Sequence, residues 1–164
     1  MLVFAHAGLT ISAARAIDRD VDPRWAAALA LGPDLLDKPL SLLDPALINH
    51  NTRSFGHTVF LSLFVLTALL IWKRRPKPAL VLWACYIGHF LLDSMWRDPN
   101  PAILFWPLLG DFPPFVRGPI ADSFTPWNVL GEIAGLILLV RLSRRHRLFE
   151  RPRLAAFLKS GRLA

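Results

Sequence analysis

One pair of ionisable side chains in an apolar segment has the spacing of a metal site. His89 and Asp93 lie in the segment Gly-His-Phe-Leu-Leu-Asp-Ser at residues 88–94. A separation of four residues places both side chains on one face of a helix, one turn apart. Both could ligate one metal ion, or Asp93 could orient a ligating imidazole. The alternative is an internal hydrogen bond that only satisfies two buried polar groups.

Further histidines and carboxylates stand at the ends of other apolar segments. His6 is near the N-terminus, Asp34 and Asp37 follow a Gly-Pro pair, and His57 opens the next apolar run. With His89 and Asp93 they provide three imidazoles and up to three carboxylates. That set suits one zinc ion, or two metals that share a carboxylate. We expect a divalent metal, zinc before manganese or magnesium, which would polarise a substrate oxygen and activate a water. For His6 alone, an interfacial residue is the competing interpretation.

Two other ionisable residues are candidates for a catalytic role. Arg53 stands one helical turn before His57 and could bind a phosphate group or pair with Asp34. A solvated or headgroup-binding arginine is the alternative. Glu132 is the only ionisable residue in the last apolar run. It could act as a base or support the metal ligands, whereas the simpler interpretation is a hydrogen bond between helices.

The composition favours a membrane protein over a soluble domain. Hydrophobic residues make up 54% of the 164 residues, against roughly 45–50% in an ordinary soluble domain. Residues 58–72 carry no charge, 79–92 carry only a histidine, and 127–140 carry only one glutamate. Each run is somewhat shorter than the ~20 residues of a spanning helix, although interfacial flanks extend it. Three such runs predict an all-α fold, a polytopic membrane bundle of about four to five short helices with irregular outer loops.

Proline, glycine and polar residues set the expected helix boundaries. The Gly32-Pro33 pair is expected to stop the second helix, so that residues 32–56 form an irregular loop. Residues 97–126 contain seven prolines and are expected to form a second, external loop. The predicted helices cover residues 2–17, 24–31, 57–72, 79–96 and 127–141.

The positive charge is gathered beside the apolar runs. The net charge is +7, and basic residues cluster at 73–77 and 141–153. Such clusters are typical of cytoplasmic flanks that meet anionic headgroups, so we expect membrane lipids and no nucleic acid as partners. Both clusters are then cytoplasmic and the N-terminus is outside. Residues 1–148 would form the membrane-embedded domain and 149–164 a basic cytoplasmic tail.

The order of these motifs resembles a known family. An early histidine, Gly-Pro-Asp at 32–34, Arg-x-x-x-His at 53–57 and His-x-x-x-Asp-Ser at 89–94 are similar to the YdjM-like membrane-bound metal-dependent hydrolases. The chain has Asp-Leu-Leu-Asp at 34–37 where Asp-x-Asp is common in that family. The resemblance implies a multi-helix inner-membrane hydrolase. A more distant similarity to zinc-dependent phospholipase C suggests phosphoester or lipid-like substrates.

The sequence thus predicts a metal-dependent hydrolase of the bacterial inner membrane, acting at the outer face. The alternative is a non-enzymatic binding or assembly protein whose buried His and Asp residues only hold the helices together. In the hydrolase interpretation, Arg53 and Glu132 are catalytic, and the metal ligands are His6, Asp34, Asp37, His57, His89 and Asp93.

Overall fold

The computed structural model describes residues 3–114 and 124–163, and within them the chain forms helices and no strand. The all-α prediction is therefore confirmed. The elements are α1 (Val3–Ile17), α2 (Pro23–Leu43), η1 (Ala46–Ile48), η2 (Phe55–His57), α3 (Val59–Lys73), α4 (Pro76–Leu92), α5 (Asn100–Leu104), α7 (Pro126–Arg145) and α8 (Arg151–Ser160). The loop predicted at 97–126 contains α5, and its residues 115–123 lie outside the described part of the chain.

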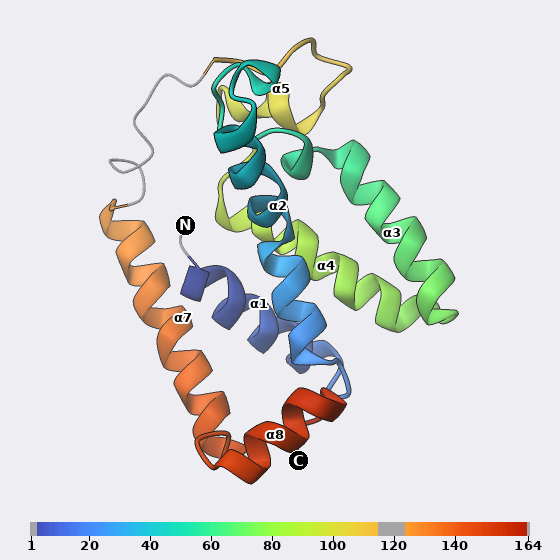
Figure 1. Cartoon of the computed structure of the whole chain (residues 1–164), viewed down its shortest axis with the longest axis vertical. Coiled ribbons are helices and arrows are strands. Elements are labelled where there is room, and N and C mark those ends of the chain that lie inside the picture. The colour runs from blue at the N-terminus through green and yellow to red at the C-terminus, as the bar shows by residue number, and fades with distance from the viewer. Residues whose placement is uncertain (1–2, 115–123, 164) are drawn as a thin grey trace.

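Helix α4 is the central element of the bundle. It contacts α1, α2 and α3, and α1 in turn packs against α2 and α7. In Figure 1, α7, α1, α4 and α3 follow one another across the molecule, and α2 crosses α1 and α4. Tyr86 and Phe90 of α4 belong to a buried apolar cluster with Met95 and Ile103, next to the η2 turn. This cluster fixes the C-terminal end of α4 against α5 and η2.

Helix α2 is longer than the sequence indicated. It runs through Pro33 and Pro39 to Leu43, so the prediction of an irregular loop from residue 32 is wrong for residues 32–43. A proline inside a helix removes one backbone hydrogen bond and strains the preceding turn, but it does not have to end the helix. Here Pro33 is buried, and the buried Asp37 anchors the second half of α2 to the η2 turn.

The ends of α3 and α4 also differ from the predicted boundaries. Thr58 caps α3 by accepting a hydrogen bond from the amide of Leu61, so His57 belongs to the η2 turn before that helix. Asp93 follows the last residue of α4 and forms its C-cap, whereas the prediction extended this helix to residue 96. Both side chains therefore emerge from backbone that is turning at a helix end.

Helices α1 and α7 approach each other at two glycines. A Cβ atom added to Gly8 would overlap the carbonyl group of Gly135, so only glycine fits there. Such small residues permit close packing of helices in membranes. About one helical turn before Gly135, the Glu132 carboxylate accepts hydrogen bonds from the amides of Phe4 (2.9 Å) and Ala5 (3.0 Å). It satisfies amides that the first turn of a helix leaves without partners.

One described helix is long and apolar enough to cross a membrane, judged by length and composition. This is α7, with 20 residues, and α1 and α3 are shorter apolar helices. The apolar side chains of α7 are mostly on the outside of the molecule, among them Trp127, Leu130 and Ile137.

The basic turn between α3 and α4 lies at the same end of the molecule as the start of α2 and the helix α8. Residues 18–22 and 73–78 contribute to one hollow, and the guanidinium of Arg24 donates to the carbonyl oxygen of Leu158. Burial disfavours the charged form of Asp22, but hydrogen bonds from the side chain and amide of Arg24 outweigh it and lower the pKa of Asp22. In Figure 1, α8 and α5 lie at opposite ends of the molecule.

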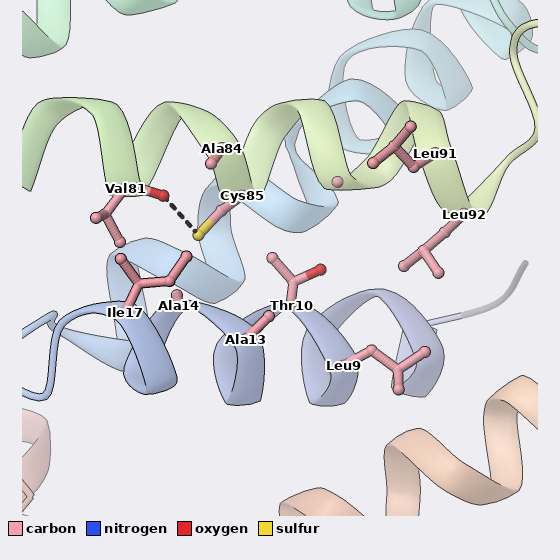
Figure 2. A pocket seen from close by; sticks show the side chains of 11 residues that line it. Leu9, Thr10, Ala13, Ala14, Ile17, Val81, Ala84, Cys85, Leu91 and Leu92 are labelled. Carbon is pink, nitrogen blue, oxygen red and sulfur yellow. Dashed lines mark hydrogen bonds between the residues drawn. The ribbon is translucent and has the colours of Figure 1, made fainter.

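A groove runs between α1 and α4. Its volume is about 260 Å³, and Figure 2 shows its lining, with Leu9 and Leu92 at one end and Ile17 and Val81 at the other. The lining residues are Leu9, Thr10, Ala13, Ala14, Ile17, Val81, Ala84, Cys85, Gly88, Leu91 and Leu92.

Candidate metal centre

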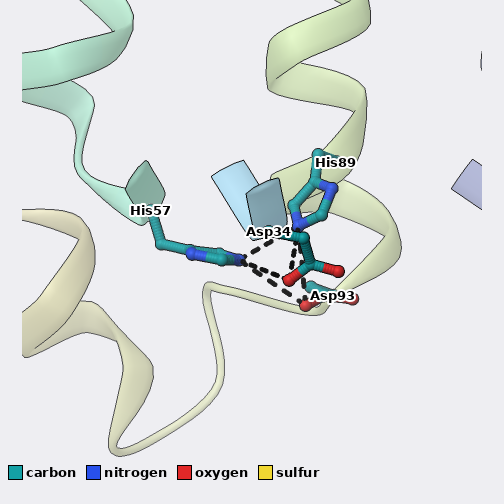
Figure 3. Close-up of side chains that lie close together, drawn as sticks. All are labelled: Asp34, His57, His89 and Asp93. Carbon is teal, nitrogen blue, oxygen red and sulfur yellow. Dashed lines mark hydrogen bonds and ion pairs between the residues drawn. The ribbon is translucent and has the colours of Figure 1, made fainter. Parts of the chain in front are cut away.

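Four ionisable side chains converge where α2, η2 and the end of α4 meet. Asp34, His57, His89 and Asp93 each offer one ligand atom, and these four atoms lie within 4.8 Å of one another (Figure 3). The two Nε2 atoms of the histidines are 3.0 Å apart. Each of them is 3.9 Å from Oδ1 of Asp34 and 3.8 Å from Oδ2 of Asp93. Residues far apart in the sequence thus point at one common centre.

The backbone of α2 fixes the orientation of His89. Its Nδ1 atom is 2.7 Å from the carbonyl oxygen of Ala30. A carbonyl oxygen can only accept, so Nδ1 must carry the hydrogen. In the neutral imidazole the Nε2 atom then has a free lone pair, and this lone pair faces the centre.

A buried carboxylate fixes His57 in the same way. The Nδ1 atom of His57 is 2.7 Å from Oδ2 of Asp37. Asp37 also accepts hydrogen bonds from the amides of Ser54 (2.6 Å) and Gly56 (2.7 Å), which favours its ionised form. An ionised carboxylate accepts from His57 Nδ1–H, so Nε2 of the neutral ring again presents its lone pair to the centre.

No proton donor is therefore fixed between the two imidazoles. Two neutral imidazoles would bring two lone pairs together at 3.0 Å, and two carboxylate oxygens face them with further negative charge. One extra proton could join the two imidazoles, but it would still leave both carboxylate oxygens facing the pair at 3.8–3.9 Å. A cation placed among the four atoms would satisfy all of them at once.

The donor types and separations fit a divalent metal. Two imidazole nitrogens and two carboxylate oxygens are common ligands of zinc, whose bonds of ~2.0–2.1 Å place tetrahedral donors roughly 3.3 Å apart. The five donor pairs that involve a histidine are separated by 3.0 to 3.9 Å, a range that includes this value. Small side-chain movements would bring the donors to bonding distance.

Two predicted site residues hold Asp93 in place. Arg53 donates from Nε and Nη2 to Oδ2 of Asp93, each over 3.1 Å. His6 contacts the other oxygen, with Nε2 3.2 Å from Oδ1, and its ring lies 4.1 Å from that of His89. His6 and Arg53 are thus placed beside the four-donor group, and both contact it through Asp93.

The other two predicted site residues lie elsewhere. Asp37 was predicted as a ligand, but the structure places it behind His57, where its oxygens bond to the η2 turn. Glu132 was predicted as catalytic, and both of its oxygens accept amides at the start of α1. Neither carboxylate belongs to the four-donor group.

One contact was missed in the sequence. The amine of Lys38 is 2.6 Å from Oδ2 of Asp34, the oxygen that does not face the histidines. The signal was available, because Asp34 and Lys38 are four residues apart on one helix. The pair was not predicted because the helix was expected to end at Leu31, before both residues.

The accessible side chains of the centre are those of Asp34 and Arg53. The side chains of His57 and His89 are fully buried and that of Asp93 is 4% exposed, whereas Asp34 is 16% and Arg53 30% exposed. The centre is therefore most accessible at the edge formed by Asp34 and Arg53. Lys38, at 54% exposure, lies on the same edge.

These features define a class of protein: a small all-helical chain with an apolar outer helix and a buried His/Asp cluster suited to a metal. The chain belongs to the YdjM inner membrane protein family, whose model matches residues 1–158. No curated protein and no solved structure matched the chain significantly.

Proposed function

We propose that this protein is a metal-dependent hydrolase of the inner membrane that acts on an anionic phosphoester or lipid-like substrate. The observation that supports it is the pair of Nε2 atoms of His57 and His89, which face each other at 3.0 Å with an oxygen of Asp34 and one of Asp93 beside both. Structural polar contacts pair donors with acceptors, because an unpaired buried polar atom is costly. Two imidazole nitrogens that face each other as acceptors are expected where a cation binds.

Each residue of the centre has a role that follows from its contacts. His57 and His89 supply neutral nitrogen donors, and Asp34 and Asp93 supply the two negative charges that balance a divalent cation. Asp37 and the Ala30 carbonyl hold the two imidazoles in the ligating tautomer. Two imidazoles favour zinc, with manganese next and magnesium least. When bound, such an ion acts as a Lewis acid toward a substrate oxygen.

The open edge favours an anionic substrate. Arg53 and Lys38 both reach it, and a guanidinium presents paired donors that match phosphate oxygens. Arg53 already spans from the η2 region to Asp93, so a phosphoryl group that it binds would lie next to the centre.

We place the centre on the outer side of a polytopic bundle. The basic turn at 73–77 and α8 lie at one end of the molecule, and the centre lies toward the end that carries α5. Basic flanks remain cytoplasmic, so the centre faces out. In Asp111→Cys and Ser160→Cys variants, an impermeant thiol reagent should label only position 111 in intact cells, and the reverse pattern would place the centre on the cytoplasmic side.

The deciding experiment measures metal content and hydrolysis together. Protein purified in detergent without added chelator should hold about one zinc or manganese ion per chain, and should hydrolyse a chromogenic phosphoester at a rate that chelation removes. Metal-free protein that cannot be loaded would favour the alternative, in which the His and Asp residues only hold the helices together. Metal without hydrolysis of any phosphoester would indicate a binding protein.

A further inference from the structure

We propose that the groove between α1 and α4 holds the acyl chain of an anionic membrane lipid whose headgroup reaches the metal centre. The inference rests on the proposed function for its headgroup end, and it assigns the substrate class: a phosphate-bearing lipid with a hydrocarbon chain. The groove itself is independent of the metal, so the two parts can be tested separately.

The lining of the groove suits hydrocarbon. It carries no charged side chain, and its polar groups are limited to the hydroxyl of Thr10 and the thiol of Cys85. The thiol already donates to the carbonyl oxygen of Val81, as Figure 2 shows. What remains is an apolar surface between two helices, and covering such a surface with hydrocarbon lowers the free energy.

Small residues form much of the lining of the groove. Ala13, Ala14, Ala84 and Gly88 lie along its walls, where larger side chains would close it. A Cβ atom at Gly88 would be 3.5 Å from the hydroxyl oxygen of Thr10, so even an alanine there would begin to fill the space. A groove lined by small residues accommodates a flexible hydrocarbon chain more readily than it accommodates the bulky side chains of another helix.

One end of the groove lies beside residues of the metal centre. Its lining includes Gly88 and Leu92, which directly precede the site residues His89 and Asp93 in the sequence. Across the groove, Leu9 faces Leu92 (Figure 2), and His6 stands one turn before Leu9, with its ring against His89. A chain lying in the groove would therefore bring its polar end to the centre.

Charge separates the two ends of such a ligand. The groove is uncharged, whereas Arg53 and Lys38 stand at the edge of the centre. An anionic headgroup is attracted to the cationic edge, and its tail is excluded from it. The chain also belongs to an inner-membrane family, so phospholipids with such tails surround it.

The test uses a lysophosphatidic acid whose acyl chain carries a diazirine near its middle, added to the purified protein in detergent. After illumination, mass spectrometry should find the label within residues 9–17 and 81–92. Ala84→Phe and Ala13→Phe each place a ring in the groove from an exposed position. Each should lower labelling of these segments about tenfold, because excluding about two methylene groups of the acyl chain from the groove lowers its affinity by about that factor.

The matched control is Ala68→Phe, which adds the same ring at an exposed position of α3, away from the groove. It should label like the unaltered protein, and all variants should keep their metal content. Labelling that is spread evenly over α3 and α7, or that is unchanged in Ala84→Phe, overturns the inference. If the same protein carries its metal, the proposed function still stands. Label confined to the groove in a protein that binds no metal overturns the proposed function and keeps the acyl-chain assignment.

Discussion

Two regions of this protein place carboxylates at contacts between apolar helices, and they differ in how their hydrogen bonds balance. At the contact of α1 with α7, Glu132 meets the amides of Phe4 and Ala5, so each of its oxygens has a donor. At the meeting point of α2, η2 and α4, two lone pairs of His57 and His89 and two carboxylate oxygens face one another.

The difference separates a structural polar group from a candidate ligand. Both regions contain ionisable residues within apolar surroundings, so burial or residue type alone does not distinguish them. The balance of donors and acceptors does. The contact at Glu132 is complete without any further atom, whereas the Nε2 atoms of His57 and His89 face each other with no donor fixed between them.

The largest expected effect is that of His89→Ala on metal binding. Removing this imidazole deletes one of four donors, so metal affinity should fall by more than the roughly 10–100-fold that removing an outer partner costs. In chelator, the unfolding free energy should fall by no more than about 2 kcal/mol, from lost packing. Metal content and thermal unfolding in detergent measure the two effects.

The opposite pattern would make the two regions alike. If the unaltered protein holds no metal and His89→Ala lowers the unfolding free energy well beyond about 2 kcal/mol, the cluster is a structural contact like that of Glu132. The hydrolase proposal would then be dropped.

The next effect is expected from Asp37→Asn. An amide removes the charge that holds the His57 Nδ1–H, and its NH₂ group would meet an amide of the η2 turn. Metal affinity should weaken roughly 10–100-fold, because the imidazole loses its fixed tautomer and orientation. Asp44→Asn, an exposed change at the end of the same helix, is the control and should keep the affinity. An unchanged affinity in Asp37→Asn would remove Asp37 from the support of the site.

At the other region, Glu132→Ala should change stability and leave metal binding alone. The first turn of α1 loses the acceptor for two amides, and the loss of such a cap costs about 0.5–2 kcal/mol. Ile133→Ala, a change at an exposed neighbour, controls for lost contact with detergent. Loss of metal in Glu132→Ala would show that the two regions are coupled and would restore a role for Glu132 at the centre.

Much of the architecture could be predicted from the uncharged runs, because apolar stretches bounded by basic residues leave few alternatives to helices. The spacing of His89 and Asp93 indicated one helical face, and the structure places their facing atoms 3.8 Å apart. That His57 would meet them depended on the direction of the chain in neighbouring helices, which follows from short connections between α3 and α4.

The supporting contacts could not be predicted. Asp34 and Asp37 are three residues apart on α2, so both lie near one face, and periodicity cannot tell which reaches the centre. The choice is made by the η2 turn, whose amides at Ser54 and Gly56 engage Asp37. Such irregular turns have no periodic signal. The proline rule also failed at Pro33, because tertiary contacts override a local preference.

The smallest expected effect concerns Lys38, whose contact with Asp34 lies at the border between the two kinds of polar group. The pair is structural in type, since a donor meets an acceptor, yet it holds the outer oxygen of a candidate ligand. Because Lys38 is 54% exposed, water and salt screen its charge, and an exposed pair of this spacing contributes about 0.3–0.5 kcal/mol. Lys38→Ala should therefore weaken metal affinity by no more than about threefold, with Ser41→Ala as a neighbouring control on the same helix. Metal affinity is measured by titration at low and at high salt. A larger loss of affinity at low salt that disappears at high salt would show that the lysine sets the charge of the centre and not only the position of Asp34.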